Sequence, residues 1–411
     1  MILVIYNQTI KALTVSVIAM LFFTLSSHSQ YYWVGGTGNW SDYATHWATS
    51  SGGSSFHTQA PTVDDDVYFN ANSFTSTGQV VTMNVTNSTC RSMDWTGVLN
   101  NPTFESANFD VLRVYGSVTL GADMLCNIGI IEFWSSNPAT MITSQGTSFG
   151  NSAIIRFQGT GVYELADNLE ADAIQMQQGT FKTNGNSFTL DFSFTLNGAS
   201  SKTVDFGNSN LYMQQWRTWG SNNNILPGTY TIHTSSFYAD EEDTGPYTYN
   251  NLVFLENGAI LEGNGIYNVI DINGTAGEFI KIESGKTITC NQFLGTGTRH
   301  NPLEILTTVT GQAATIEKTS GTVDLDFVIL ADVHAEGGAT FNATNCLDLG
   351  NNAGWNITDI VALPFYWVGN GGDWDDVSHW ATTSGGATSY NDIPSRFDDV
   401  YIDANSISNG G

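Results

Sequence analysis

The chain has 411 residues, of which 12 are basic and 39 acidic, so its formal net charge is −27. A surface this negative repels phosphate backbones and excludes nucleic acid as a partner. Hydrophobic residues make up 41% of the chain, which excludes a disordered protein, and the scarcity of Glu, Lys, Arg and Gln disfavours a helical bundle.

Residues 1–29 are predicted to be a secretory signal peptide. Lys11 precedes an apolar run from Ala12 to Leu25 that is short for a membrane-spanning helix, and Ser27-His28-Ser29 offers small residues to a signal peptidase. The alternative is an N-terminal membrane anchor. Because no second apolar span follows, we expect a secreted or cell-surface protein whose mature chain has no membrane span.

A signature rich in Trp and Gly occurs twice. The first copy reads YWVGGTGNWSDYATHWATSSGGSSFHTQAPTVDDDVYFNANSF, and the second reads YWVGNGGDWDDVSHWATTSGGATSYNDIPSRFDDVYIDANSI. Trp47 aligns with Trp380, an offset of 380 − 47 = 333 residues, so the repeating unit has the size of a large domain. We expect residues 30–75 to be a cap or entry segment. Residues 361–411 should then be the truncated start of a second module, which makes the sequence a fragment of a longer chain.

Residues 76–360, between the two copies, consist of short segments that alternate apolar and polar residues. Examples are FDVLRVYG, AIIRFQG, NLVFLENG and EFIKIESG, each ended by a turn former. This pattern predicts strand after strand. The run has no linker and its segments look alike, with Asn, Thr and Ser recurring at turns, where their side chains can bond the backbone of neighbouring coils. We therefore expect an all-β parallel β-helix, with tandem β-sandwiches as the alternative.

The tryptophans of the first copy are candidate ligand-binding residues. Exposed rings at Trp33, Trp40 and Trp47 would form a platform on which sugar rings stack. Aromatic residues at such spacing more often build a small core, because Trp has a large area to bury. Both interpretations fit the repetition of these rings in the second copy.

Asp65 and Asp66 are candidate calcium ligands, since calcium prefers carboxylate and carbonyl oxygens. The competing interpretation is that an Asp before a strand bonds a turn amide. Two other positions that could supply calcium ligands differ between the copies, because Asn39 and Ser41 of the first copy correspond to Asp373 and Asp375 of the second. Apart from this possible calcium ion, no cofactor is expected.

No residue is assigned a catalytic role. A glycosidase needs two carboxylates that flank the bond, and a polysaccharide lyase needs a cation beside its acidic substrate together with a base. The available candidates are Glu132, Glu164, Asp191, Asp205, Arg113, Arg156 and Arg217. They do not cluster in sequence, and the register of the coils that would bring them together cannot be read from the sequence.

The cysteines and the two repeated histidines are expected to be structural. The cysteines lie in or beside strand-like runs without a C-x-x-C motif, so they are either disulfides or buried free thiols, and packing is slightly favoured. They are Cys90, Cys126, Cys290 and Cys346. His46 and His379 recur before Trp, and no second metal ligand stands at a suitable spacing.

The signatures, the run TCRSMDWTG and the run from Ala314 to Trp355 resemble the large secreted repeat proteins of Bacteroidota, which are adhesin-like surface proteins. The resemblance implies a right-handed, pectin-lyase-like β-helix, surface display and a structural or adhesive role. Such proteins commonly end in a C-terminal sorting domain, which is not visible here.

The main hypothesis is therefore a non-catalytic surface scaffold or adhesin whose partners are extracellular polysaccharides or cell-surface components. The alternative is a carbohydrate-active enzyme, a lyase or hydrolase, or a carbohydrate-binding module. A catalytic site should show paired carboxylates, or an Arg beside acidic residues, within about 6–10 Å. Ice or mineral binding would require a strict T-x-T regularity that is lacking.

Overall fold

The computed structural model describes residues 28–106, 110–150, 152–239, 246–255 and 258–407. The predicted signal peptide, residues 1–29, lies outside the described residues except for its last two. In the part of the chain that is described, no helix is both long enough and apolar enough to span a membrane.

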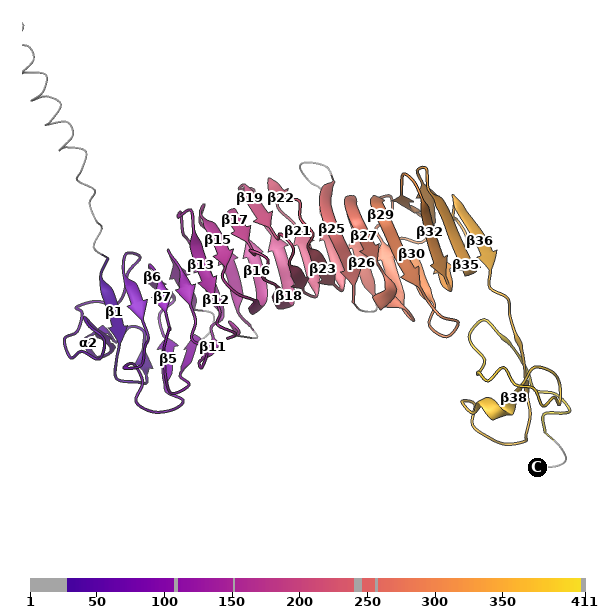
Figure 1. Cartoon of the computed structure of the whole chain (residues 1–411), viewed down its shortest axis with the longest axis horizontal. Helices are drawn as coiled ribbons and strands as arrows, with labels where there is room; N and C mark the ends of the chain where they lie inside the picture. Colours follow the sequence, from indigo (N-terminus) through magenta and orange to yellow (C-terminus); the bar gives the residue numbers. More distant parts are fainter. Residues whose placement is uncertain (1–27, 107–109, 151, 240–245, 256–257, 408–411) are drawn as a thin grey trace, which may run out of the picture.

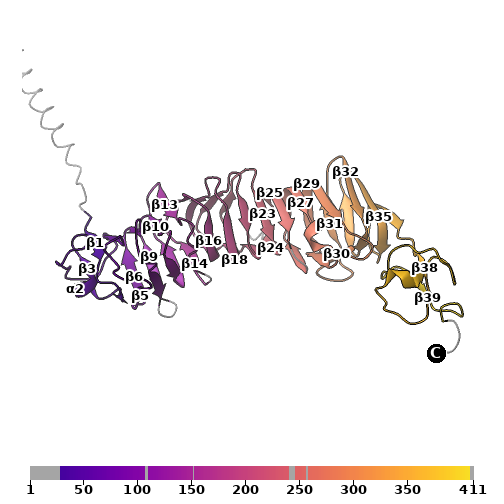
Figure 2. The same cartoon turned by 60° about the horizontal axis from the view of Figure 1, so that its bottom comes forward.

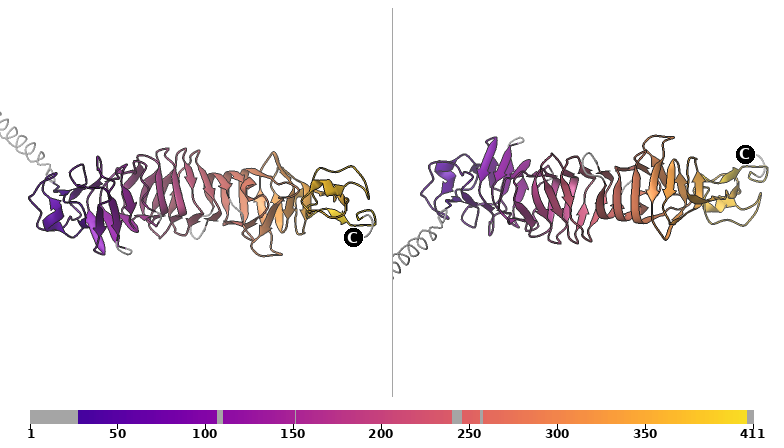
Figure 3. Two further views of the ribbon diagram at one scale, coloured as in Figure 1. Left: turned by 90° about the horizontal axis from the view of Figure 1, so that it is seen from below. Right: turned by 90° about the horizontal axis from the view of Figure 1, so that it is seen from above.

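Strands from successive coils lie side by side in long parallel sheets, which makes the chain a parallel β-helix of about 12 turns. The coils form an elongated rod in every view, with the indigo N-terminal coils at one end and the orange coils at the other (Figures 1, 2 and 3). The predicted fold class is confirmed. Tandem sandwiches are excluded because sandwich sheets are antiparallel, whereas these coils pair in parallel.

Three groups of strands build the rod. One sheet contains β3 (Trp47–Ala48), β1 (Gln30–Trp33), β4 (Asp66–Tyr68), β7 (Met93–Asp94), β10 (Val118–Thr119), β13 (Thr140–Thr143), β15 (Val162–Leu165), β17 (Gly179–Lys182), β19 (Lys202–Asp205) and β22 (Asn223–Ile225). A short sheet contains β2 (Gly38–Asn39), β5 (Val80–Met83), β8 (Thr103–Ser106) and β11 (Leu125–Asn127).

The other strands cover the remaining faces. They are β6 (Asn87–Cys90), β9 (Val111–Val114), β12 (Ile130–Phe133), β14 (Ile154–Phe157), β16 (Leu169–Met176), β18 (Phe188–Leu196), β20 (Asn210–Tyr212), β21 (Gln215–Thr218), β23 (Thr231–Thr234), β24 (Ser236–Ala239), β25 (Tyr247–Phe254), β26 (Ala259–Glu262), β27 (Gly265–Asp271), β28 (Phe279–Ile282), β29 (Thr287–Thr296), β30 (Leu303–Thr307), β31 (Ala314–Glu317), β32 (Thr322–Asp326), β33 (Val328–Leu330), β34 (Val333–Glu336), β35 (Thr340–Asp348) and β36 (Trp355–Asp359). Helical turns are short: α2 (Tyr43–His46), η1 (Asn273–Thr275) and η2 (Val377–His379).

The core of the rod is a set of ladders of apolar side chains. Ile131 pairs with Ile155, which pairs with Ile174, so one coil takes 155 − 131 = 24 residues and the next takes 174 − 155 = 19. Two coils beyond Ile174 on the same ladder, Trp216 stacks on Phe237 with ring centroids 5.7 Å apart. Period-two alternation thus places every second side chain inside, where stacking between coils stabilises it.

Asparagine side chains bond neighbouring coils to each other, as the sequence predicts. Asn268 donates a hydrogen bond to the side chain of Asn251 in the preceding coil. Asn291, from the coil after, donates one to the side chain of Asn268. Asn222, whose φ is +57°, donates to the carbonyl of Ala199 one coil away. Amide side chains therefore link one coil to the next, both within strands and at a turn.

All four cysteines are buried free thiols. They lie on β6, β11, β29 and β35, on four separate coils. This agrees with the packing interpretation, in which a thiol serves as a small apolar side chain.

The first cap, residues 30–75, closes the N-terminal end of the rod. Strand β3 lies at the edge of its sheet and runs antiparallel to β1, with Trp47 opposite Trp33. The second cap, residues 364–407, repeats this pairing with β37 (Pro364–Trp367), β38 (Trp380–Ala381) and β39 (Asp399–Tyr401), and Trp380 lies opposite Trp367. The second cap follows the last coil, at the yellow end of the chain (Figure 1).

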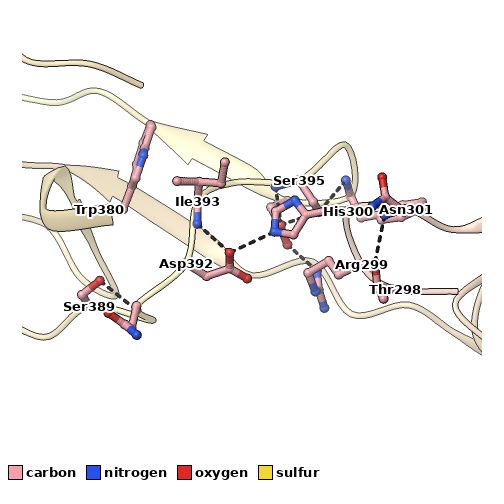
Figure 4. A network of polar contacts seen from close by, with 12 residues as sticks. Thr298, Arg299, His300, Asn301, Trp380, Ser389, Asp392, Ile393 and Ser395 are labelled. Carbon is pink, nitrogen blue, oxygen red and sulfur yellow. Dashed lines mark hydrogen bonds and ion pairs between the residues drawn. The ribbon is translucent and has the colours of Figure 1, made fainter. Parts of the chain in front are cut away.

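A cluster of ion pairs joins the second cap to the rod (Figure 4). Arg299 pairs with Asp398, whose side chain is 0% exposed, and Arg396 lies 2.6 Å from Glu304. His300 lies 2.9 Å from Asp392, which is about half exposed. These contacts fix the second cap against β30 and the loop that precedes it.

Candidate functional site

The three tryptophans proposed as a sugar platform form the core of the first cap. Trp33, Trp40 and Trp47 are 1%, 1% and 0% exposed. Their rings meet edge to face, with Trp47 4.9 Å from Trp33 and 5.0 Å from Trp40 between centroids. The indole of Trp47 donates to the carbonyl of Trp40. Burial leaves these rings no exposed face for a sugar, so the geometry agrees with the packing alternative.

The repeated histidines lie on the same tryptophans. His46 stacks on Trp33 at 4.6 Å, and its Nδ1–H donates to the carbonyl of Val34 at 2.7 Å. His379 makes the equivalent contacts in the second cap, at 4.7 Å and 2.7 Å. Both side chains therefore have the structural role expected from the sequence.

The proposed calcium ligands are held by protein groups. Asp65 accepts hydrogen bonds from the amide and hydroxyl of Thr62, which is the turn arrangement named as the alternative. Asp66 forms an ion pair with Arg91 at the rim of a pocket of about 210 Å³. Calcium takes six to eight oxygen ligands. Among the described residues, no group of three or more His, Cys, Asp or Glu side chains could hold a metal ion.

The carboxylates considered for catalysis lie on different faces of the rod. Glu164 pairs with Lys182 at 3.6 Å, and Asp205 follows Lys182 in the register of the same sheet. Asp191 lies near Asp172, at an irregularity in the pairing between β16 and β18. Burial, and then the charge of Asp191, raises the pKa of Asp172.

The remaining candidates meet on one outward-facing column, one residue from each successive coil. We call these residues the arginine column. Its members are Arg113, Glu132, Arg156, Gln175, Thr195, Arg217, Tyr238 and Glu262. All three arginines singled out in the sequence belong to it. The chain has 12 basic residues, one of which, Lys11, lies in the predicted signal peptide. The arginine column contains three of the other 11.

The arginine column is anchored at Glu132, which is only 6% exposed. Its carboxylate accepts from Arg113 at 3.1 Å and from Arg156 at 3.4 Å, and the indole of Trp134 donates to it at 3.1 Å. One negative charge is thus shared by two guanidinium groups. The Glu132 cluster keeps a net positive charge in a chain that is otherwise strongly acidic.

Exposed aromatic rings flank the arginine column. The guanidinium carbon of Arg217 lies 4.3 Å from the ring centre of Trp219 and 5.1 Å from that of Phe192. Trp219, Phe192 and Trp134 are 52%, 39% and 38% exposed. Neighbouring strands are about 4.8 Å apart, so Arg113 and Arg156 are separated by about 10 Å and Arg156 and Arg217 by about 14 Å. Guanidinium groups bind carboxylates and sulfates, and exposed indoles stack on apolar faces such as those of sugars.

The sequence predicts part of the arginine column, the outward direction of its arginines, but not their alignment. VLRV, IIRF and QWRT each place an Arg directly after a fully buried core residue. That pattern shows that all three arginines point outward. It does not show that they are aligned, because the coils between them differ in length.

Comparison of the sequence with models of known protein families, with curated proteins and with solved structures finds no match. The class of protein is therefore defined by the fold itself, a capped parallel β-helix with the cap repeated after the last coil.

Proposed function

We propose that this chain is a non-catalytic scaffold or adhesin, secreted or displayed at the cell surface, whose arginine column binds acidic polysaccharide. The observation that carries the proposal is the alignment of Arg113, Arg156 and Arg217 on one face, beside exposed aromatic rings. The predicted signal peptide supports the location outside the cell. The resemblance of the caps to secreted repeat proteins of Bacteroidota supports the adhesive role.

A long acidic polymer matches this face in shape and charge. The column runs along the rod, so an extended chain lying on it meets one coil after another. Arginine suits this role because its planar guanidinium binds carboxylates in a bidentate manner. A net charge of −27 opposes non-specific attraction of polyanions, so binding depends on the local positive charge of this column.

The test is a binding titration of the full chain with polygalacturonate, chondroitin sulfate and a neutral polymer such as dextran. We expect binding to the two acidic polymers, none to dextran, and weakening with added salt. Arg217→Gln should reduce affinity, whereas Lys281→Gln, on another column of the rod, should not. Equal binding of dextran, or equal loss with Lys281→Gln, would contradict the proposal.

A second candidate function, glycoside hydrolysis, is favoured by one observation. Asp172 and Asp191 lie near each other on neighbouring coils, and the pKa of Asp172 is raised by burial and by Asp191. A carboxyl whose pKa is raised, lying beside a second carboxyl, is the pattern of a general acid and its partner. Adjacent rungs are about 4.8 Å apart, close to the spacing of about 5–5.5 Å in retaining glycosidases.

The two functions are separated by measuring new reducing ends. Under the scaffold proposal, polygalacturonate stays intact after long incubation with the chain. Release of oligosaccharides that is abolished by Asp191→Asn but retained in Asp123→Asn, a change at an exposed turn residue, would establish the enzyme instead.

A further inference from the structure

The interior of the second cap reproduces that of the first cap. Trp367 and Trp380 meet edge to face at 4.9 Å, as Trp33 and Trp47 do. Phe365 and Trp380 are both 0% exposed. The second cap is therefore folded around its own core.

One face of the second cap is uncovered. Its apolar side chains Trp374, Val400, Ile402 and Ile407 are 49%, 38%, 64% and 55% exposed. The aligned residues of the first cap are 1%, 0%, 0% and 3% exposed, and they are Trp40, Val67, Phe69 and Phe74. We call these four residues of the second cap the open face. Other aligned core residues, such as Trp47 and Trp380, are buried in both caps.

The first cap shows what covers this face. Trp95, from the coil that follows, stacks on Phe69 with ring centroids 3.6 Å apart and an interplanar angle of 4°. Phe104 lies 6.1 Å from Trp40. The covering group is thus the first coil of the β-helix, residues 80–106.

Strand pairing differs in the same way. In the first cap, β4 pairs with β1 on one side and with β7 on the other, and the amides of Val67 and Phe69 donate to the carbonyls of Ser92 and Asp94. In the second cap, β39 is the edge of its sheet and pairs only with β37 among the described strands. Asp399 is exposed, whereas its counterpart Asp66 pairs with Arg91.

We propose that the open face of the second cap is a docking surface for the first coil of a parallel β-helix of the kind formed by residues 80–106. The occupant adds a strand parallel to β39, places a large aromatic ring on Ile402 as Trp95 does on Phe69, and supplies a cation to Asp399 as Arg91 does to Asp66. An apolar, unpaired edge is a template for strand addition. The ion pairs that hold the second cap on the rod involve Asp392, Arg396 and Asp398, none of which belongs to the open face.

The probe for this surface is the first coil of a second copy of the full chain. In Trp33→Ala/Trp47→Ala/Phe69→Ala, the first cap loses three rings of its core, which frees its first coil. We expect this variant to form concentration-dependent, end-to-end oligomers in sedimentation velocity, whereas the unmodified chain stays monomeric. Adding Val400→Glu and Ile402→Glu should restore the monomer. Adding Val377→Glu should not, since this exposed residue of the second cap aligns with an exposed position of the first cap.

A photo-crosslinker at position 401 of the same variant gives a second readout. Tyr401 aligns with Tyr68, which pairs with Asp94, so crosslinks should join it to residues 91–97 of another molecule. Crosslinks to other segments, no crosslinks, or oligomers that persist with Val400→Glu and Ile402→Glu would overturn the proposal.

Discussion

Buried side chains set the chemistry of individual residues, and the thiols give the first prediction. Burial raises the pKa of Cys126 to about 12 and that of Cys290 to about 11, so almost no thiolate is present near pH 8. We expect Ellman's reagent to label none of the four cysteines in the native chain and all four after denaturation without a reductant. Fewer than four reactive thiols in the denatured chain would reveal a disulfide and contradict the structure.

Asp172 gives a prediction with a defined sign. Its pKa is raised from 3.8 by burial and by Asp191. The ionised form of Asp172 is therefore less favourable in the folded chain than in the unfolded chain. The resulting loss of stability appears as the pH rises through the raised pKa, and it vanishes below the ordinary value of 3.8. Asp172→Asn should therefore raise the urea midpoint at pH 7 and leave it unchanged at pH 3. The same gain in Asp123→Asn, at an exposed turn, would show a general charge effect instead.

At the scale of single strands, Glu132 balances two arginines from neighbouring coils. Glu132→Gln keeps the shape of the side chain but removes its charge, so both guanidinium groups lose their partner. We expect unfolding free energy to fall by about 1–2 kcal/mol, since the arginines are partly solvated. Affinity for polygalacturonate should rise. Glu164→Gln removes an equal charge on another sheet and should not raise it; if it does, net charge rather than the arginine column governs binding.

The joint between rod and second cap depends on one buried carboxylate. Burial alone would raise the pKa of Asp398, but hydrogen bonds from Ser395 and Leu363, together with Arg299, hold it below its ordinary value. The stability that it contributes is present above the ordinary pKa and is lost as the pH falls through the lowered one. Asp398→Asn should speed proteolysis of residues 360–363 by on the order of tenfold.

Asp392→Asn is the matched control for the joint. It removes a half-exposed partner of His300 and should change the rate of cleavage little. Equal acceleration in both variants would mean that the ion pair of Arg299 is not what holds the second cap.

Across the whole molecule, the elements were predictable from sequence and the sites were not. The aligned Trp47 and Trp380 were enough to predict two caps, and period-two runs such as IIRF were enough to predict strands. The alignment of the arginine column could not be predicted, because it depends on the lengths of the coils, which vary from 19 to 24 residues. These lengths are set by the turns between strands. The open face could not be predicted because Trp40 and Trp374 occupy equivalent positions of the repeated signature, and only what lies against them decides their exposure.

The same geometry explains why a β-helix suits the proposed function. Equivalent positions of successive coils are separated along the rod by a fixed distance of about 4.8 Å. Residues far apart in sequence therefore form one straight row. Net charge and local charge can then have opposite signs, as they do at Glu132 and its two arginines. An acidic protein can in this way bind an acidic polymer along a single face.

The most direct test is a crystal structure of the full chain with a hexamer of galacturonic acid bound. The proposed function predicts that the oligosaccharide lies parallel to the rod across β9 to β21, with carboxylates on Arg156 and Arg217 and a ring against Trp219. A hexamer bound elsewhere, or no binding in the presence of excess ligand, would contradict it.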